Sequence, residues 1–230
     1  MKLTPRLQAI ADSINNGGVL ADVGTDHAYL PIYLVQNGRI SKAIASDINK
    51  GPIEIARKRI AAHCLEQKIE ARQGSGFTVL KPKEADTIVI AGMGGMLISE
   101  IIEASKEVAE SAEVLIMQPM LDSGKLRSYL LQNGFEIFDE ELAKEDTKIY
   151  EIIWARYTGK PQEPAGLMNI GEIIIKKKHP LAVELIDKEI AEINNILQKL
   201  GNTESELTQK RVQECHELLN YYNEVRKWVQ

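Results

Sequence analysis

The sequence has 230 residues, of which 44% are hydrophobic and 27% are charged, and its formal net charge is −5. This length suffices for one full core of about 150 to 200 residues and a small additional unit. The charge excludes blanket affinity for nucleic acid but not a basic patch on an acidic body, and no apolar run approaches the roughly 18 residues of a membrane span.

Strands and helices are predicted to alternate along the first part of the chain. Short apolar runs that predict buried strands cover residues 19–24, 43–47, 69–72, 86–91 and 114–118. Pro5 and Pro52 stand at the first position of predicted helices, and the segment 121–134 reads as another helix that stops at a glycine. Such alternation implies a parallel sheet with helices on its faces.

The pattern changes after residue 134. Two strand-like runs, 135–141 and 149–157, are separated only by a polar turn at 143–148, which predicts a hairpin that adds one antiparallel strand at the sheet edge. A dinucleotide-binding Rossmann fold would continue with a second half of strands and helices. We therefore expect the α/β fold of class I methyltransferases that use S-adenosylmethionine: a Rossmann-like, seven-stranded, mostly parallel sheet with an antiparallel terminal hairpin.

The end of the chain is predicted to be a separate helical unit. We assign residues 1–160 to the methyltransferase domain, 161–172 to a linker and 173–230 to an antiparallel coiled-coil hairpin, an arm of roughly 30 to 40 Å. Gly201-Asn202 and a capping box of Thr203 with Glu206 predict the break between its helices. The apolar residues at coiled-coil spacing are Val183, Ile186, Ile190, Ile193, Leu197 and Leu200, then Val212, Cys215, Leu219, Tyr222, Val225 and Val229.

The stretch DVGTDHAYLP, residues 22–31, follows the first predicted strand and is a candidate ligand loop. Its single glycine, Gly24, lets the backbone turn beneath a ligand, whereas a dinucleotide-binding loop has three. Asp47 ends the second predicted strand, 23 residues after Gly24, and is placed to accept hydrogen bonds from ribose hydroxyls. A tight turn, an acid for the ribose and no phosphate cradle favour a nucleoside sulfonium, S-adenosylmethionine, as the ligand.

Two further groups of residues bear on the reaction. Asp26 either caps the following helix, accepts from the amine of a substrate base or meets the cofactor's ammonium group, and His27 either bonds a backbone carbonyl or accepts from that amine. The fourth predicted strand ends in AGMGGML, residues 91–97, whose glycines leave room for a flat ring. Methyltransferases that act on the amino groups of bases often carry Asn/Asp-Pro-Pro-Tyr/Phe at this position, and this chain does not.

Together these motifs resemble those of the bacterial tRNA (adenine-22-N1)-methyltransferases. The resemblance rests on 24–31, AGMGG at 91–95, Gln118-Pro119, Leu126-Arg127, the N-terminal LTPRL and the helical hairpin, and it spans nearly the whole chain. It implies transfer of the methyl group of S-adenosylmethionine to N1 of adenine 22, in the D-arm region of tRNA. The cofactor contacts that it implies are Asp22, Gly24, His27, Tyr29, Asp47, Ile48, Gly74, Ser75 and Gly92.

The expected catalytic residues are Asp26, Arg6 and Tyr29. Tyr29 would stack on a base that is swung out of the tRNA, Asp26 would accept from its amine, and Arg6 would hold the flanking phosphate. The expected tRNA contacts are Lys176, Lys177, Lys178 and Arg127, whereas the run 57–59 is interpreted as a solvated helix face. The chain departs from the family at Ser75 and Met120, where relatives often have an acid and an asparagine.

Alternative functions are weighed against this one. A methyltransferase acting on a protein or small molecule shares the fold, so the fold alone does not exclude it. An NAD-dependent oxidoreductase lacks its GxGxxG motif here, and a non-catalytic RNA-binding scaffold would not need Asp47 and Gly24. We expect no metal site, reduced thiols at Cys64 and Cys215, and hence a cytoplasmic protein. A monomer is expected, with dimerisation through the coiled coil as the alternative.

Overall fold

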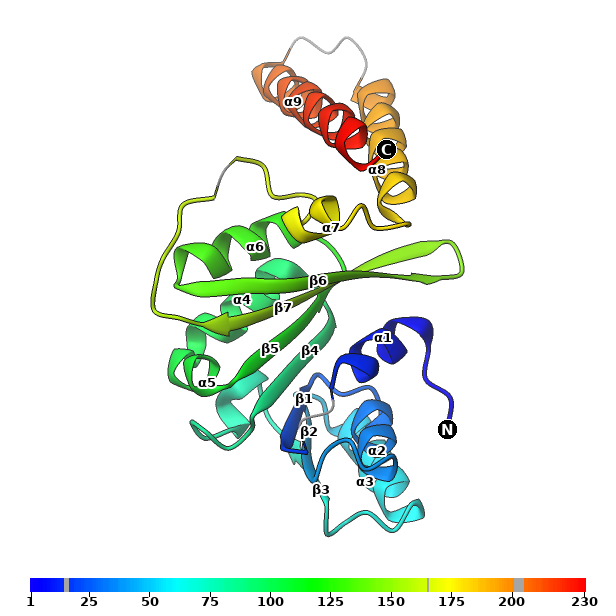
Figure 1. Cartoon of the computed structure of the whole chain (residues 1–230), viewed down its shortest axis with the longest axis vertical. Coiled ribbons are helices and arrows are strands. Elements are labelled where there is room, and N and C mark those ends of the chain that lie inside the picture. Colours follow the sequence, from blue (N-terminus) through cyan, green and yellow to red (C-terminus); the bar gives the residue numbers. More distant parts are fainter. Residues whose placement is uncertain (15–16, 165, 201–204) are drawn as a thin grey trace. The chain divides into compact units, whose positions relative to one another are not determined.

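The computed structural model describes residues 1–14, 17–164, 166–200 and 205–230. The chain divides into two compact units, Met1–Asn169 and Ile170–Gln230, which we describe separately (Figure 1). The predicted helix break at Gly201-Asn202 and the capping residue Thr203 lie outside the described residues, as does the side chain of Glu206.

The first unit contains a seven-stranded sheet in the order β3-β2-β1-β4-β5-β7-β6. Its strands are β1 (Val19–Val23), β2 (Lys42–Asp47), β3 (Ile69–Gln73), β4 (Thr87–Met93), β5 (Val114–Pro119), β6 (Phe135–Glu145) and β7 (Lys148–Tyr157). The first five strands are parallel, and β7 pairs antiparallel with both β5 and β6. The predicted class I fold is therefore confirmed, and each of the first five strands ends within two residues of its predicted bounds.

Two details of the hairpin were predicted wrongly. The antiparallel strand is not at the edge, because β7 returns between β5 and β6 and leaves β6 outermost. The turn is also shorter than 143–148, because the strands stay paired from Ala143 and Tyr150 out to Glu145 and Lys148. Ala143 is buried, which holds the pairing in a stretch whose polar residues otherwise indicate a loop.

Helices cover both faces of the sheet because the strands bury apolar side chains on both sides. The helices of this unit are α1 (Pro5–Ser13), α2 (Tyr29–Gln36), α3 (Lys50–Ala62), α4 (Gly95–Ala104), α5 (Lys106–Ser111) and α6 (Ser123–Gln132), with a 3₁₀ turn at Gly76–Val79. Side chains of α1, α2 and α3 pack with Leu20, Val89 and Ile116 in one core cluster. The other cluster joins α4, α5 and α6 to Ala21 and Ile90, in accordance with the two-residue period of a strand.

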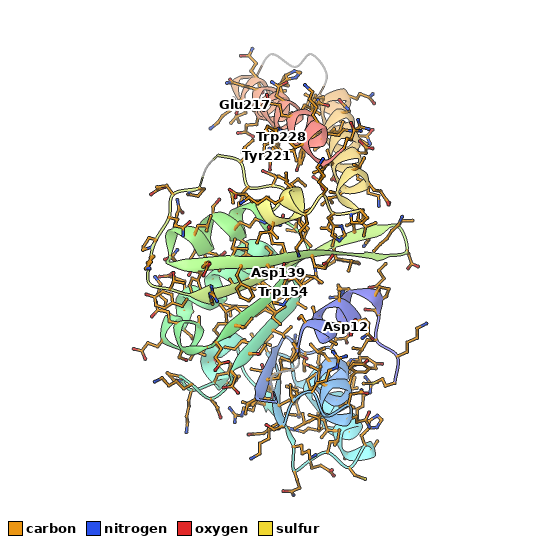
Figure 2. All side chains as sticks on the ribbon, in the orientation of Figure 1. Asp12, Asp139, Trp154, Glu217, Tyr221 and Trp228 are labelled. Atoms are coloured by element: carbon orange, nitrogen blue, oxygen red, sulfur yellow. The ribbon has the colours of Figure 1, made fainter. Side chains whose placement is uncertain are left out.

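The N-terminal helix α1 is attached to the terminal hairpin. Pro5 occupies its first turn, as predicted. The indole Nε1 of Trp154, which Figure 2 labels on β7, donates to Ser13 Oγ on α1 at 3.0 Å. Residues almost a whole domain apart in sequence are thereby joined, and the start of the chain is held at the sheet.

The second unit is helical and contains α7 (Glu172–Lys176), α8 (Ala182–Leu200) and α9 (Glu206–Val229). Two polar contacts join the long helices: Arg226 Nε donates to Asp187 Oδ1 at 2.7 Å, and the Tyr222 hydroxyl donates to Glu189 Oε2 at 3.2 Å. The residue numbers rise on α8 as they fall on α9, so the helices run antiparallel. Residues of the predicted apolar seams that are buried are Ile186, Ile193, Cys215, Tyr222, Val225 and Val229. No helix in the described ranges is long and apolar enough to span a membrane.

Arg127 on α6 is a core residue of the first unit, with only 1% of its side chain exposed. Its guanidinium pairs with Glu140 at 2.6 Å and with Glu151 at 2.5 Å, and Nη1 donates to the carbonyl oxygen of Met168 at 3.0 Å. The prediction that Arg127 contacts tRNA is wrong, because its guanidinium is buried and is paired with Glu140 and Glu151. Sequence spacing could not reveal this, since both glutamates come from the hairpin.

Replacing Arg127 with alanine should destabilise the protein strongly. Two carboxylates would lose their cation, and breaking a buried ion pair from one side costs about 3 to 5 kcal/mol. Urea denaturation would measure this loss, with Arg156→Ala as the control, since Arg156 pairs with Glu136 on the exposed surface. Equal losses in the two variants would contradict the assignment.

Candidate active site

The turn after β1 is fixed to the end of β2. The backbone N–H groups of Gly24 and Thr25 both donate to the carbonyl oxygen of Ser46, at 2.8 and 2.7 Å. Gly24 has φ +77°, and a Cβ there would lie 2.1 Å from the terminal methyl group of Met93. The positive φ of the turn favours glycine, whereas the flexible end of the Met93 side chain could move aside for a Cβ. The turn consequently lies beside Asp47, the residue that follows Ser46 and ends β2.

Asp22 on β1 carries a buried carboxyl group beneath this turn. Its Oδ2 accepts from the Thr25 hydroxyl at 2.5 Å. Burial raises the pKa of this carboxyl to about 6, and the Asp26 carboxylate adds to the rise, whereas Thr25 and the Arg6 guanidinium oppose it. A cation bound nearby would favour the ionised form, so the site is suited to a positively charged ligand.

Asp26 does not cap α2, so that alternative is wrong. The Thr25 hydroxyl, and not Asp26, accepts the Ala28 N–H, at 3.2 Å. The side chain of Asp26 is 72% exposed, with Oδ1 3.6 Å from Nδ1 of His27. Asp26 can therefore meet either a substrate amine or a cationic group of a cofactor.

The loops after β2 and β3 are joined at the same edge. Oδ1 of Asp47 accepts the N–H of Asn49 at 2.7 Å, and the backbone carbonyl of Asp47 accepts the N–H of Gly74 at 3.0 Å. Ile48 is 61% exposed beside them. The predicted cofactor residues Asp47, Ile48, Gly74 and Ser75 thus form one continuous rim.

Arg6 on α1 reaches the carboxyl ends of β4 and β5. Its Nη1 donates to Oε1 of the buried Gln118 at 2.8 Å and would lie 3.5 Å from a Cβ on Gly92. The guanidinium lies 5.4 Å from the centre of the Tyr150 ring. Its Nε is 4.0 Å from Oε2 of Glu145, and both atoms are buried without a hydrogen-bond partner in the part of the chain that the structure describes. The sequence did not single out Glu145 and Tyr150, because they belong to the hairpin.

Tyr29, the first residue of α2, is covered on one side by a cation. The Arg59 guanidinium lies 3.8 Å from the centre of its ring, and Nη1 of Arg59 donates to the carbonyl oxygen of His27 at 3.2 Å. The interpretation of 57–59 as a solvated face is therefore wrong for Arg59, although Arg57 and Lys58 are exposed. A flat ligand that stacks on Tyr29 would use the face opposite Arg59.

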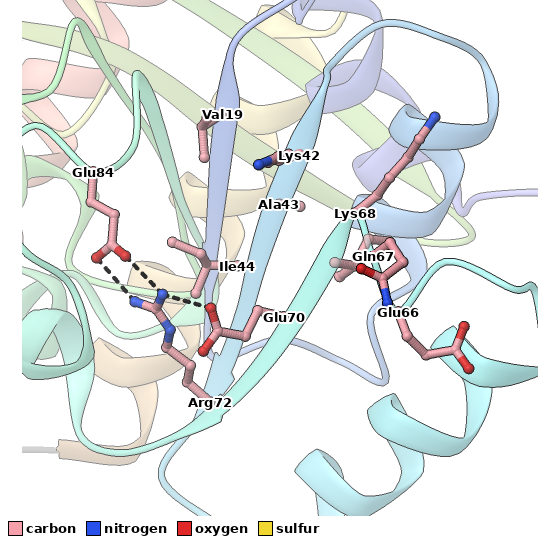
Figure 3. Close-up of a pocket in the computed structure, with 11 residues that line it drawn as sticks. Val19, Lys42, Ala43, Ile44, Glu66, Gln67, Lys68, Glu70, Arg72 and Glu84 are labelled. Carbon is pink, nitrogen blue, oxygen red and sulfur yellow. Dashed lines mark hydrogen bonds and ion pairs between the residues drawn. The ribbon is translucent and has the colours of Figure 1, made fainter.

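A separate cavity of about 350 Å³ lies at the amino ends of the strands, opposite the loops described above (Figure 3). Val19, Lys42 and Ile69, which begin β1, β2 and β3, line it. Arg72, one of several charged residues that line it, is already paired with Glu70 and Glu84, at 2.7 Å each. Ligands of open α/β sheets bind outside the carboxyl ends of the strands, so this cavity is not the candidate active site. Among the described residues no group of three His, Cys, Asp or Glu could hold a metal ion.

The three predicted lysine contacts lie in the helical unit. Lys176 ends α7, and Lys177 and Lys178 follow it. All three are exposed, and Nζ of Lys176 lies 2.9 Å from Glu172. They form an exposed basic segment, which we call the lysine segment.

Comparisons with known proteins converge on one family. The family described as tRNA (adenine(22)-N(1))-methyltransferase matches residues 20–221. The Bacillus subtilis protein of that name is 35% identical over 98% of this chain and 97% of its own length, and the crystal structure of that organism's M1A22 tRNA methyltransferase TrmK superposes with a TM-score of 0.88, covering 98% of this chain and 99% of its own. Streptococcus pneumoniae Sp1610, solved in complex with S-adenosyl-L-methionine, has 33% identity and a TM-score of 0.82, covering 95% of this chain and all of its own.

The buried carboxyl of Asp22 gives a pH-dependent prediction. Its folded-state pKa of about 6 lies above the ordinary value of 3.8, so the folded state binds the proton more tightly and loses stability as the pH rises through this range. Without ligand, Asp22→Asn should therefore raise the free energy of unfolding at pH 8, by at most about 3 kcal/mol, and have little effect below pH 4. Urea denaturation across this pH range measures it. A variant that is less stable than the parent at pH 8 would show that the ionised carboxyl is well compensated.

Proposed function

This chain belongs to the tRNA (adenine(22)-N(1))-methyltransferase family, and we propose that it transfers the methyl group of S-adenosylmethionine to N1 of adenine 22 in tRNA at the carboxyl edge of β1, β2 and β4. The observation that carries the proposal is the pairing of a buried carboxyl, Asp22, with a single-glycine turn that is fixed beside Asp47. Family membership supports tRNA over the alternative of a protein or small-molecule substrate. A tRNA substrate also supports the cytoplasm as the site of the reaction.

The residues at this edge fit the cofactor. S-adenosylmethionine supplies, when bound, a methyl group on a positively charged sulfur, and it has an ammonium group and no phosphate. Asp22 would hold the ammonium group. Burial disfavours the ionised carboxylate and raises its pKa, and a bound cation would stabilise that ionised form. Asp47 would accept from the ribose hydroxyls, since its carboxylate lies at the end of β2 beside the turn. The remaining proposed cofactor contacts are Gly24, His27, Tyr29, Ile48, Gly74, Ser75 and Gly92.

The substrate base needs positioning more than activation. Neutral adenine N1 has a free lone pair, so the site needs no general base to create the nucleophile. N1 lies on the Watson–Crick edge, however, and swinging the base out costs a few kcal/mol. Tyr29 would stack on it with the face opposite Arg59, and Asp26 would accept from its amine and stabilise the cationic product. Arg6, held by Gln118, would grip the flanking phosphate, and such positioning can supply much of the rate.

The product identifies the reaction directly. The protein is incubated with methyl-labelled S-adenosylmethionine and unmodified tRNA, which is then digested to nucleosides. We expect the label in 1-methyladenosine, and its loss when adenine 22 is changed to guanine. Arg6→Ala should lower the rate by about tenfold or more, the value of a charge-assisted hydrogen bond, while Arg57→Ala, on exposed α3, should not. Label in another nucleoside, or in none with several tRNAs, would refute the proposal.

The helical unit would contribute affinity for tRNA through the lysine segment. Three adjacent exposed ammonium groups on a chain of net charge −5 form a local basic site. Binding of lysine to phosphate releases counterions, so the affinity for tRNA should fall with salt. Lys176, which is paired with Glu172 only at the surface, can exchange that partner for a phosphate at little cost.

Changing Lys176, Lys177 and Lys178 together to alanine should flatten the salt dependence of tRNA binding. The logarithmic slope should fall by about 2 to 3 units, because each phosphate contact contributes somewhat less than one unit. The affinity for S-adenosylmethionine should stay the same. Lys81→Ala with Lys83→Ala, two exposed lysines before β4, is the control. An unchanged slope in the triple variant would remove the lysine segment from the tRNA contacts.

A further inference from the structure

Two loops at the edge of the site are fixed to each other. The N–H of Met120 donates to the carbonyl oxygen of Met93, and the N–H of Gly95 donates to that of Leu121, both at 2.8 Å. A Cβ on Gly95 would lie 2.5 Å from the backbone oxygen of Asp122, so only glycine permits this approach. The first turn of α4, which follows β4, and the loop after β5 thus form one firmly connected surface.

This surface is apolar and exposed. Met96 is 46% exposed, Leu97 48%, Met120 44% and Leu121 65%. They are four of the twelve large hydrophobic side chains that are exposed in the described residues. Exposed apolar side chains that gather in one place mark an interaction surface. We call these four residues the apolar tip.

The apolar tip is continuous with the proposed reaction site. Met96 comes four residues after Gly92 on β4, and Met120 two residues after Gln118 on β5. Gly92 and Gln118 are the two residues beside the Arg6 guanidinium. On its other side, Nζ of Lys125, whose side chain is 66% exposed, lies 2.9 Å from Asp122 Oδ1, and it can exchange this partner for a phosphate at little cost. The apolar tip is thus flanked by the cations Arg6 and Lys125. Such a surface is complementary to a nucleic acid strand, because its unstacked bases can contact the apolar side chains while its phosphates pair with the cations.

We propose that the apolar tip, with Leu121 foremost, is a wedge that enters the base stack of the tRNA where the target adenine leaves it. This inference rests on the proposed function, because a base must leave the stack for its N1 to be methylated. Leucine and methionine side chains inserted between base steps replace part of the lost stacking. The tip therefore lowers the free energy of the swung-out state, whereas Tyr29 and Asp26 hold the adenine once it is out. Met120, where relatives often have asparagine, increases the apolar area of the wedge in this chain.

The test uses the full-length protein and tRNA with 2-aminopurine in place of the target adenine. Fluorescence of this base rises when it leaves the stack, so the parent protein should produce a rise that Leu121→Ala largely abolishes. On normal tRNA, Leu121→Ala should lower kcat by about tenfold, because unstacking costs a few kcal/mol. Its affinity for S-adenosylmethionine and its Tm should match those of the parent, and Leu121→Met should restore the rate. Ile55→Ala, an exposed residue of α3, is the control.

A second substrate separates a wedge from an ordinary contact. When the base opposite the target adenine is replaced by an abasic residue, the adenine leaves the stack more easily, and Leu121→Ala should recover most of its rate. Equal slowing on both tRNAs, or an unchanged fluorescence rise, would overturn the wedge.

Two other outcomes distinguish the remaining possibilities. If Leu121→Ala instead changes the molar mass in light scattering and leaves kcat unchanged, the apolar tip is a contact between copies of the chain and the inference is wrong. If the parent protein itself methylates no tRNA, the proposed function fails first.

Discussion

The site depends on one constraint: the carboxyl group of Asp22 is buried beneath the turn at Gly24 and Thr25, whose backbone is fixed by hydrogen bonds. Asp22 keeps its carboxyl out of water with one hydroxyl partner, Thr25, and burial raises its pKa to about 6. The two hydrogen bonds from the turn to Ser46 prevent the chain from opening to relieve this cost. A cation bound at this site would remove the cost. If the ammonium group of the cofactor is that cation, as we propose, binding recovers the free energy that the fold gives up at Asp22.

The rest of the site is assembled around that edge from distant parts of the chain. Arg6 comes from the first helix, Gln118 from the fifth strand, and Glu145 and Tyr150 from the terminal hairpin. None of these groups needs to take a proton from adenine N1, because its lone pair is already available. Gln118, Glu145 and Tyr150 surround the Arg6 guanidinium and keep it beside Gly92. The reaction therefore needs no general base, but it still needs side chains that are fixed in position at a partly buried site.

How far the sequence predicts this molecule depends on the range of the interactions involved. Local patterns predicted the parallel strands, the single-glycine turn and the position of Asp47 at the end of the second strand, because strand periodicity and turn chemistry are short-range properties. Pairing between residues distant in sequence cannot be predicted from local patterns. Arg127 has the sequence features of a surface cation, but Glu140 and Glu151 pair with it in the folded chain. Arg59 likewise reads as a solvated residue, but its guanidinium lies over the ring of Tyr29. Helix α4 was not foreseen either, since its first residue, Gly95, indicates a loop, and only its close approach to Asp122 explains the glycine.

The most direct test of this account is the number of protons released when S-adenosylmethionine binds. Titration calorimetry at pH 6, in two buffers of different ionisation enthalpy, measures this number. If Asp22 is partly protonated in the free protein and ionises against the cofactor's ammonium group, about half a proton should be released, falling toward zero at pH 8. Asp22→Asn should abolish this release. No release from the parent protein at pH 6, or the same release from the variant, would contradict the claim that the buried carboxyl of Asp22 anchors the cofactor.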